Sequence, residues 1–272
     1  MRPISIMQGR LLPRYKNKYQ AFPVGYWQAE FHIAKELGFS GIEWIVDYNG
    51  WDQNPLLNSV GTQEIKLLSN STGVCVLSVC ADCFMEASFH SHHQSDSEKI
   101  LRKLIDQAGL LGIRDIVIPC VDQSSLKSES DKKQLIHSIS TVLKSTQSSI
   151  KINLETDLNP RDFKQLLSQF DVPIYVNYDT GNSASLGYNP EEEFSVYGHL
   201  ISDLHIKDRL LNGGSVPLGS GDVQFDVIFQ LLKEYSFSGT MVMQTARSDN
   251  YLSDLSGVAK QLEFISKKWK LI

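Results

Sequence analysis

The sequence predicts a (β/α)8 barrel, in which eight parallel strands close into a cylinder surrounded by helices. Short apolar runs alternate with helix-like segments along the whole chain, eight of each, without an internal repeat or a low-complexity linker. Strict alternation indicates parallel strands with the helices outside, and eight units is the number that closes a barrel. Because 272 residues suit one such barrel, we expect a single domain spanning residues 1–272.

The first half of the chain supplies four units. Apolar residues at helical spacing, such as Phe31 and Ala34, indicate the helices, and Gly38 just past the first helix is typical of a helix end. The expected strands are residues 4–9, 41–46, 74–81 and 115–121, and the expected helices are 27–38, 62–73, 95–112 and 131–146.

The second half follows the same plan. Its apolar runs are rich in Ile, Val, Leu, Met and Tyr, which is typical of buried parallel strands, and Asn159 before Pro160 indicates a helix start. The expected strands are residues 150–157, 172–179, 201–208 and 239–245, and the expected helices are 159–170, 190–201, 222–236 and 253–270.

An open, doubly wound sheet is the alternative architecture. Such a sheet usually has a glycine-rich turn after its first strand, whereas residues 7–14 (MQGRLLPR) contain a single glycine. The sequence therefore favours the barrel and gives little support for dinucleotide binding.

Composition argues against several classes of protein. A net charge of -5 disfavours sequence-independent nucleic-acid binding and favours a small-molecule partner. The sequence contains no apolar run long enough for a membrane helix or a signal-peptide core, so we expect no membrane partner and a cytoplasmic location. Four cysteines in a chain of this size do not make a disulfide framework, and the lone CxxC of Cys80 and Cys83 is a weak motif.

Each strand of the second half ends in a residue that can bind a metal. These residues are Glu155, Asp179, His205 and Gln244. Because the carboxyl ends of barrel strands meet at one face, we expect these four side chains to lie close together. Carboxylate and imidazole ligands suit Mn, Mg, Co or Zn.

Each of these residues also has a structural interpretation. An unpaired buried carboxylate is costly, so Glu155 is solvated, paired or a ligand. Asp179, in the sequence YDTGN, could simply form a turn with the following glycine. A lone histidine such as His205 is more often a core residue, but three candidates on successive strands favour a metal site.

Six motifs carry a resemblance to a known family. They are MQGRL (7–11), GIEW (41–44), LETD (154–157), YDTGN (178–182), LHIKD (204–208) and PLGSGDVQFD (217–226). The chain resembles the xylose isomerase-like TIM barrels, and within them the sugar-phosphate isomerase/epimerase group that includes tagatose and xylulose-phosphate epimerases and inosose dehydratase. The resemblance implies a sugar or sugar-phosphate substrate and a divalent-metal cofactor, and such barrels often form homo-oligomers.

Within that resemblance, Glu155, Asp179, His205 and Gln244 are the expected metal ligands, and Glu155 is also the expected acid/base. The family usually has a glutamate where this chain has Gln244. An amide oxygen can bind a metal but cannot accept a proton at neutral pH. The change favours a one-base isomerisation, or another one-base reaction, over epimerisation, unless the site has lost this chemistry.

Other residues near the strand ends are candidates for binding or catalysis. Four basic residues could hold a substrate phosphate or could be plain surface charges: Arg10, Lys207, Arg209 and Arg247. Lys207 and His90 are also candidate catalytic groups. His90 lies with His92 and His93 in a segment whose alternative interpretation is a mobile polar loop. Glu43 is expected to point inward, where it would position sugar hydroxyls or organise the barrel, and Asn182 and Asp208 complete the candidate substrate-binding set.

Two other functions remain open from sequence. A degenerate, non-catalytic carbohydrate-binding barrel is suggested by Gln244. Endonuclease IV-like cleavage at abasic DNA sites is disfavoured, because it requires several zinc ions, more histidine and carboxylate ligands and a basic groove, whereas this chain has seven histidines and an acidic balance.

Overall fold

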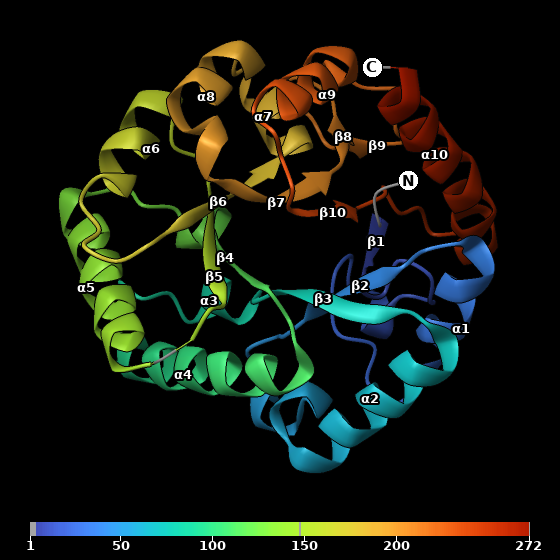
Figure 1. Ribbon diagram of the computed structural model, residues 1–272, viewed down its shortest axis with the longest axis horizontal. Helices are drawn as coiled ribbons and strands as arrows, with labels where there is room; N and C mark the ends of the chain where they lie inside the picture. The colour runs from blue at the N-terminus through green and yellow to red at the C-terminus, as the bar shows by residue number, and fades with distance from the viewer. Residues whose placement is uncertain (1–3, 147, 272) are drawn as a thin grey trace.

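The computed structural model describes residues 4–146 and 148–271 and shows a closed barrel of eight parallel strands inside a ring of helices (Figure 1). Around the barrel the strands follow the order β1 (Ile4–Met7), β10 (Thr240–Met243), β7 (Ile201–Ile206), β6 (Tyr175–Asp179), β5 (Lys151–Thr156), β4 (Asp115–Cys120), β3 (Cys75–Cys80) and β2 (Gly41–Ile45). The predicted (β/α)8 fold is confirmed.

All eight expected helices are present, with bounds that differ by a few residues. They are α1 (Gln28–Leu37), α2 (Ser59–Thr72), α4 (Gln94–Leu111), α5 (Glu129–Ser145), α6 (Pro160–Leu167), α8 (Pro190–Tyr197), α9 (Phe225–Glu234) and α10 (Tyr251–Leu271). Within the described part of the chain, no helix is both long enough and apolar enough to cross a bilayer.

The strand-to-helix loops contain short elements that the sequence pattern did not predict. They are the helices α3 (Cys83–Glu86) and α7 (Thr180–Leu186), the antiparallel pair β8 (Asp208–Arg209) and β9 (Ser215–Val216), and the 3-10 turns η1 (Tyr15–Asn17), η2 (Trp51–Gln53), η3 (Pro55–Leu57) and η4 (Asp122–Ser124). A further 3-10 turn, η5 (Gly198–Leu200), lies between α8 and β7. Most of these elements shape the mouth of the barrel, where the candidate site lies.

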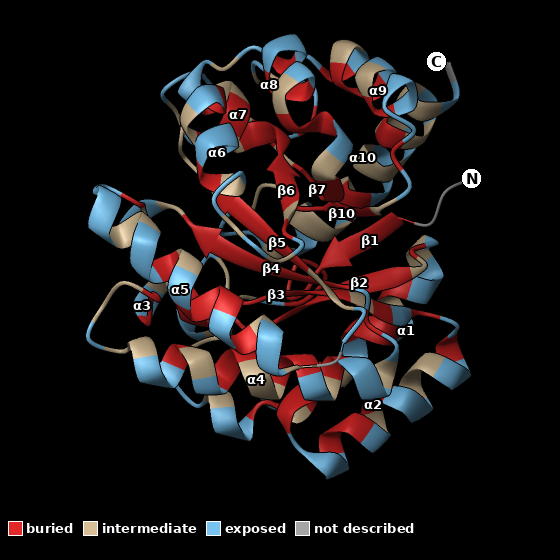
Figure 2. Cartoon of the chain, turned by 60° about the vertical axis from the view of Figure 1, so that its left-hand side comes forward, coloured by how far each residue is buried: buried red, intermediate tan, exposed pale blue. Residues whose placement is uncertain are grey.

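The apolar core lies between the strands and the helices. Trp44 on β2 packs outward, with its ring 5.1 Å from that of Trp27 and 6.5 Å from that of Phe31 on α1. Figure 2 shows buried residues throughout the strands and on the helix faces that turn toward them. The contact area that holds the fold together is therefore mainly outside the cylinder of strands.

The interior of the barrel is polar, including its amino-terminal end. There Asp115 Oδ1 accepts hydrogen bonds from Asn153 Nδ2 (3.1 Å) and Ser202 Oγ (2.9 Å), and its Oδ2 accepts one from Thr240 Oγ1 (3.2 Å). Burial raises the pKa of Asp115. The cluster links β4, β5, β7 and β10, and it satisfies polar groups that would be costly to bury alone.

Asp208 organises the loop that follows β7. Its carboxylate accepts hydrogen bonds from the backbone N–H groups of Gly219 (2.8 Å), Gly221 (2.9 Å) and Val223 (3.2 Å). Gly219 has a φ of +85°, and a Cβ at Gly221 would collide with the Asp208 carboxylate. Through these contacts Asp208 holds the PLGSGDV segment (217–223) in its conformation. The substrate-binding role expected of Asp208 stays a prediction, since the contacts seen for its carboxylate are with this loop.

We expect Asp208→Ala to lower the free energy of unfolding by about 1–3 kcal/mol, because three backbone N–H groups lose a charged acceptor. Urea unfolding followed by circular dichroism measures the change. Asp171→Ala is the control, since this carboxylate is exposed and pairs with Lys144 at the surface, and its loss should cost no more than about 0.5 kcal/mol. Equal effects in the two variants would contradict the assigned role of Asp208.

Candidate functional site

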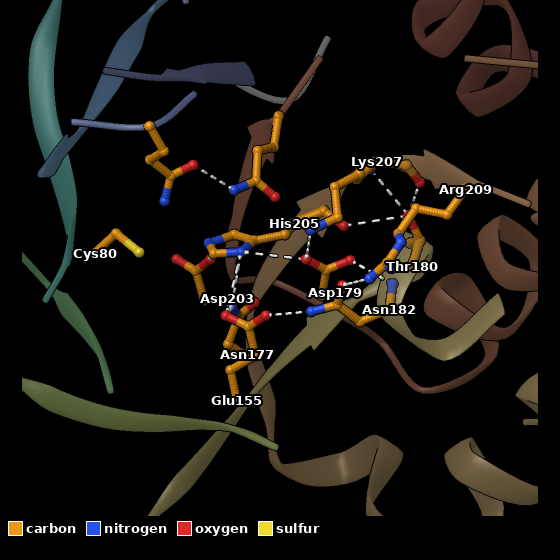
Figure 3. Close-up of polar contacts among 12 residues, drawn as sticks. Cys80, Glu155, Asn177, Asp179, Thr180, Asn182, Asp203, His205, Lys207 and Arg209 are labelled. Atoms are coloured by element: carbon orange, nitrogen blue, oxygen red, sulfur yellow. Dashed lines mark hydrogen bonds and ion pairs between the residues drawn. The ribbon is translucent and has the colours of Figure 1, made fainter. Parts of the chain in front are cut away.

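The carboxyl ends of β5, β6 and β7 bring Glu155, Asp179 and His205 together in the barrel interior (Figure 3). One ligand atom from each lies within 4.8 Å of the others. His205 Nδ1 is 3.7 Å from Glu155 Oε2 and 3.9 Å from Asp179 Oδ2, and all three residues are buried. Ligands of one divalent cation lie at comparable separations, so the geometry fits the predicted metal triad. The role of these residues as ligands remains a prediction.

Strand register explains the convergence. His205 pairs with Asp179 on one neighbouring strand and with Val242 on the other, so these side chains share the interior face. Gln244 lies two residues beyond Val242 and therefore points to the same face. Its backbone N–H donates to Ile206 O at 2.9 Å, which continues the pairing past the end of β10.

Glu43 holds the imidazole of His205 from the far side. His205 Nε2 lies 2.7 Å from Glu43 Oε1, and Ser78 Oγ donates to Glu43 Oε2 at 2.6 Å. With Nε2 engaged, Nδ1 is the ring nitrogen that faces the other two members of the triad. A carboxylate behind a metal-binding histidine is a common means of fixing ring orientation. Of the two roles expected for Glu43, its contacts favour organising the barrel over binding substrate.

The charges in the interior give the three residues different protonation behaviour. Burial raises the pKa of Glu155 to about 7, with the charge of Asp179 adding to the effect. Burial alone would lower the pKa of His205, but the surrounding carboxylates, Glu43 first, raise it to about 10. Burial would raise the pKa of Asp179, but the positive charges of Lys207 and of His205 hold this pKa below its usual value. Glu155 is thus the carboxylate whose pKa suits proton transfer near neutral pH.

Asp179 combines the two roles that the sequence left open. Its Oδ1 accepts the backbone N–H of Asn182 at 2.8 Å and caps α7, as expected of a turn residue. Its Oδ2 faces the site, where Lys207 Nζ lies 2.8 Å away. Gly181 allows this arrangement, because a Cβ there would lie 2.9 Å from Lys207 Cγ.

Two asparagines contact Glu155. Asn182 Nδ2 donates to Glu155 Oε1 at 2.6 Å, and its Oδ1 accepts from Arg209 Nη1 at 2.9 Å. Asn177 Nδ2 lies 3.4 Å from Glu155 Oε2 and 3.0 Å from His205 Nδ1. Sequence reasoning missed Asn177, although its position two residues before Asp179 on the same strand places it on the same face.

Gln244 contributes an unpartnered oxygen to the interior. Its Nε2 donates to Gln20 Oε1 at 2.9 Å, whereas its buried Oε1 has no hydrogen-bond partner among the described residues. This unpartnered carbonyl oxygen lies on the same interior face as His205, and an amide oxygen is a group that can bind a divalent cation, so the predicted ligand role of Gln244 stays a prediction.

Arg10 and His90, two further predicted residues, do not contact the triad in the described part of the chain. Arg10 is buried and donates to Tyr19 O (3.1 Å) and Gln20 Oε1 (2.8 Å), and burial lowers its pKa to about 10. Burial lowers the pKa of His90, and the charged group that opposes this effect is Asp131 on α5. The contacts of Arg10 are with the loop after β1, and the roles expected of Arg10 and His90 stay predictions.

Asp82 and Gln20 are polar residues at the mouth that the sequence reasoning missed. Asp82 follows β3 and accepts hydrogen bonds from Gln20 Nε2 at Oδ2 (2.8 Å) and from Cys80 Sγ at Oδ1 (3.1 Å). Asp82 could have been found by the strand-end rule that identified Glu155. Gln20 lies in the long loop after β1, where no periodic pattern identifies it.

Comparison with known proteins places this arrangement in a family. The chain belongs to the xylose isomerase-like TIM barrel family, whose sequence pattern matches residues 31–268. A putative L-ribulose-5-phosphate 3-epimerase of Haemophilus influenzae is 26% identical over 238 residues, which cover 80% of this chain and 83% of the relative.

Solved structures share the fold at lower sequence identity. The IOLI protein, crystallised with a zinc atom, superposes with a TM-score of 0.74 at 15% identity and covers 98% of this chain and 99% of its own. The D-allulose 3-epimerase of Methylomonas sp., crystallised with D-allulose, has a TM-score of 0.73 at 16% identity and covers 98% and 96%.

Cation binding to the triad is expected to release protons, because His205 and Glu155 must lose theirs to become ligands. With pKa values of about 10 and about 7, each ion should displace about one proton near pH 8 and nearly two near pH 6, so affinity should fall as pH falls. Calorimetric titration with Mn²⁺ in buffers of different ionisation enthalpy measures the release. Heats that do not depend on the buffer would contradict these protonation states.

Proposed function

We propose that the protein is a divalent-metal-dependent isomerase or epimerase that moves a proton between carbon atoms, or across one carbon atom, of a sugar or sugar phosphate. The observation that carries the proposal is the convergence of Glu155, Asp179 and His205 at the carboxyl end of the barrel, with their ligand atoms within 4.8 Å of one another. This face of a (β/α)8 barrel is where active sites form. The epimerase relatives support the same class of reaction.

The residues of the site have separate roles in cation binding, proton transfer and phosphate binding. A bound divalent cation would polarise the substrate carbonyl and acidify the adjacent C–H group. Glu155, Asp179, His205 and the Gln244 carbonyl would hold the cation, and Glu155 would also remove the proton to give an enediolate of the substrate. Asn182, which donates to Glu155 at 2.6 Å, keeps that carboxylate oriented. Lys207 and Arg209 at the same mouth provide positive charge for a substrate phosphate.

Epimerisation needs a second proton carrier on the opposite side of the carbon, and Gln244 cannot act as one. We assign that task to Asp82. It follows β3, which lies across the barrel from β7, and it is half-buried beside Gln20. Burial raises its pKa, which favours a group that both accepts and returns a proton.

The main test is a substrate panel with the metal-loaded protein. With Mn²⁺, Co²⁺, Mg²⁺ or Zn²⁺ present, we expect NMR to show conversion of pentulose 5-phosphates, including L-ribulose 5-phosphate, or of free ketohexoses. A chelator should abolish turnover, and Glu155→Gln should lower kcat by about 100-fold or more. Glu263→Gln, which removes an exposed carboxylate paired with Lys267, is the control and should leave kcat unchanged.

Turnover by the metal-free protein would contradict the proposal. Tight metal binding without turnover on any member of the panel would instead favour a carbohydrate-binding barrel without catalytic activity.

The role of Asp82 has a separate test in D₂O. We expect Asp82→Asn to keep exchanging the substrate C–H with solvent deuterium, because Glu155 still removes the proton, while formation of the epimer falls by about 100-fold. Glu155→Gln should lose both exchange and product. Unchanged formation of the epimer in Asp82→Asn would show that Asp82 is not the second proton carrier.

A further inference from the structure

The amide of Gln244 is held in one of its two orientations by residues from the loops after β1 and β3. Gln244 Nε2 donates to Gln20 Oε1 at 2.9 Å. The same Gln20 oxygen accepts from Arg10 Nη2 at 2.8 Å, and Gln20 Nε2 donates to Asp82 Oδ2 at 2.8 Å. Three side chains from separate segments therefore meet on the single amide of Gln20.

The donors and acceptors around Gln20 permit one orientation for each of the two glutamine amides. A guanidinium can only donate, so the Gln20 group that faces Arg10 must be the carbonyl oxygen. The Asp82 carboxylate accepts the Gln20 amide hydrogen, which supports the same orientation. Because Gln244 contacts that carbonyl, it must present its own NH₂ group there. Its Oε1 is consequently turned away from Gln20, and it is this oxygen that is buried without a partner among the described residues.

We infer that Gln20, fixed by Arg10 and Asp82, is a positioning residue that turns the Gln244 carbonyl oxygen toward the divalent cation at Glu155, Asp179 and His205. The inference rests on the proposed metal-dependent function and adds a residue outside the ligand set. It also explains how a glutamine serves at a position where the family resemblance predicts a glutamate: the loop after β1 supplies the orientation that an amide needs.

The two side chains differ in how much support they need. A carboxylate presents an oxygen whichever way it is turned, whereas an amide rotated by half a turn presents NH₂, which repels a cation. Gln20 should therefore be required when residue 244 is Gln and dispensable when it is Glu. A purely structural role for Gln20 in the loop would make no such distinction.

A double-mutant cycle on the full-length protein tests this distinction. Mn²⁺ affinity is measured by calorimetry, and the Co²⁺ absorption spectrum by titration, for the wild type, Gln20→Leu, Gln244→Glu and the double variant. We expect Gln20→Leu to weaken Mn²⁺ binding by about 10-fold or more, as is usual for partners that orient a ligand, and to alter the Co²⁺ spectrum. In the Gln244→Glu background the same substitution should change affinity by less than about 2-fold.

Lys18→Leu is the matched control, since it places leucine at an exposed position of the same loop and should leave metal affinity unchanged. Thermal unfolding of the metal-free proteins checks that each variant is folded. The inference is overturned if Gln20→Leu leaves Mn²⁺ affinity unchanged, or if it weakens binding equally in both backgrounds. Failure of the wild type to bind Mn²⁺ or Co²⁺ would overturn the proposed function and this inference with it.

Discussion

The contact between His205 and Glu43 is the constraint on which the site depends. It crosses the barrel interior from β7 to β2, and both side chains are almost completely removed from solvent. Removing one partner of a buried charged pair typically costs about 3–5 kcal/mol, because the other charge is left uncompensated. The pair thus fixes the imidazole plane, assigns Nδ1 to the triad, and raises the pKa of the ring in the cation-free protein.

The order of strands and helices could be predicted because burial on both faces gives parallel strands a continuous apolar pattern that the helices interrupt. The grouping of Glu155, Asp179 and His205 could be predicted for a related reason, since a closed barrel brings the ends of successive strands to one face. Both inferences use only chain order and periodicity.

Contacts between loops could not be predicted in this way. The hydrogen bonds of Gln20 and of Asp208 depend on loop conformations that periodicity does not encode. Glu43 shows the same limit within a strand: alternation predicts that it points inward, but the partner it meets, His205, is set by the closure of the barrel. The sequence thus predicts the face on which a side chain lies more readily than the residue that the side chain contacts.

The barrel places the contacts that stabilise the fold and the side chains of the candidate site in different regions. The apolar contacts that stabilise the fold, such as those around Trp44, lie outside the strands, while the side chains of the Asp115 cluster and the triad line the inside. A substitution in the interior can therefore alter chemistry while leaving the main apolar contact area intact. Such a scaffold tolerates exchange of its reactive groups.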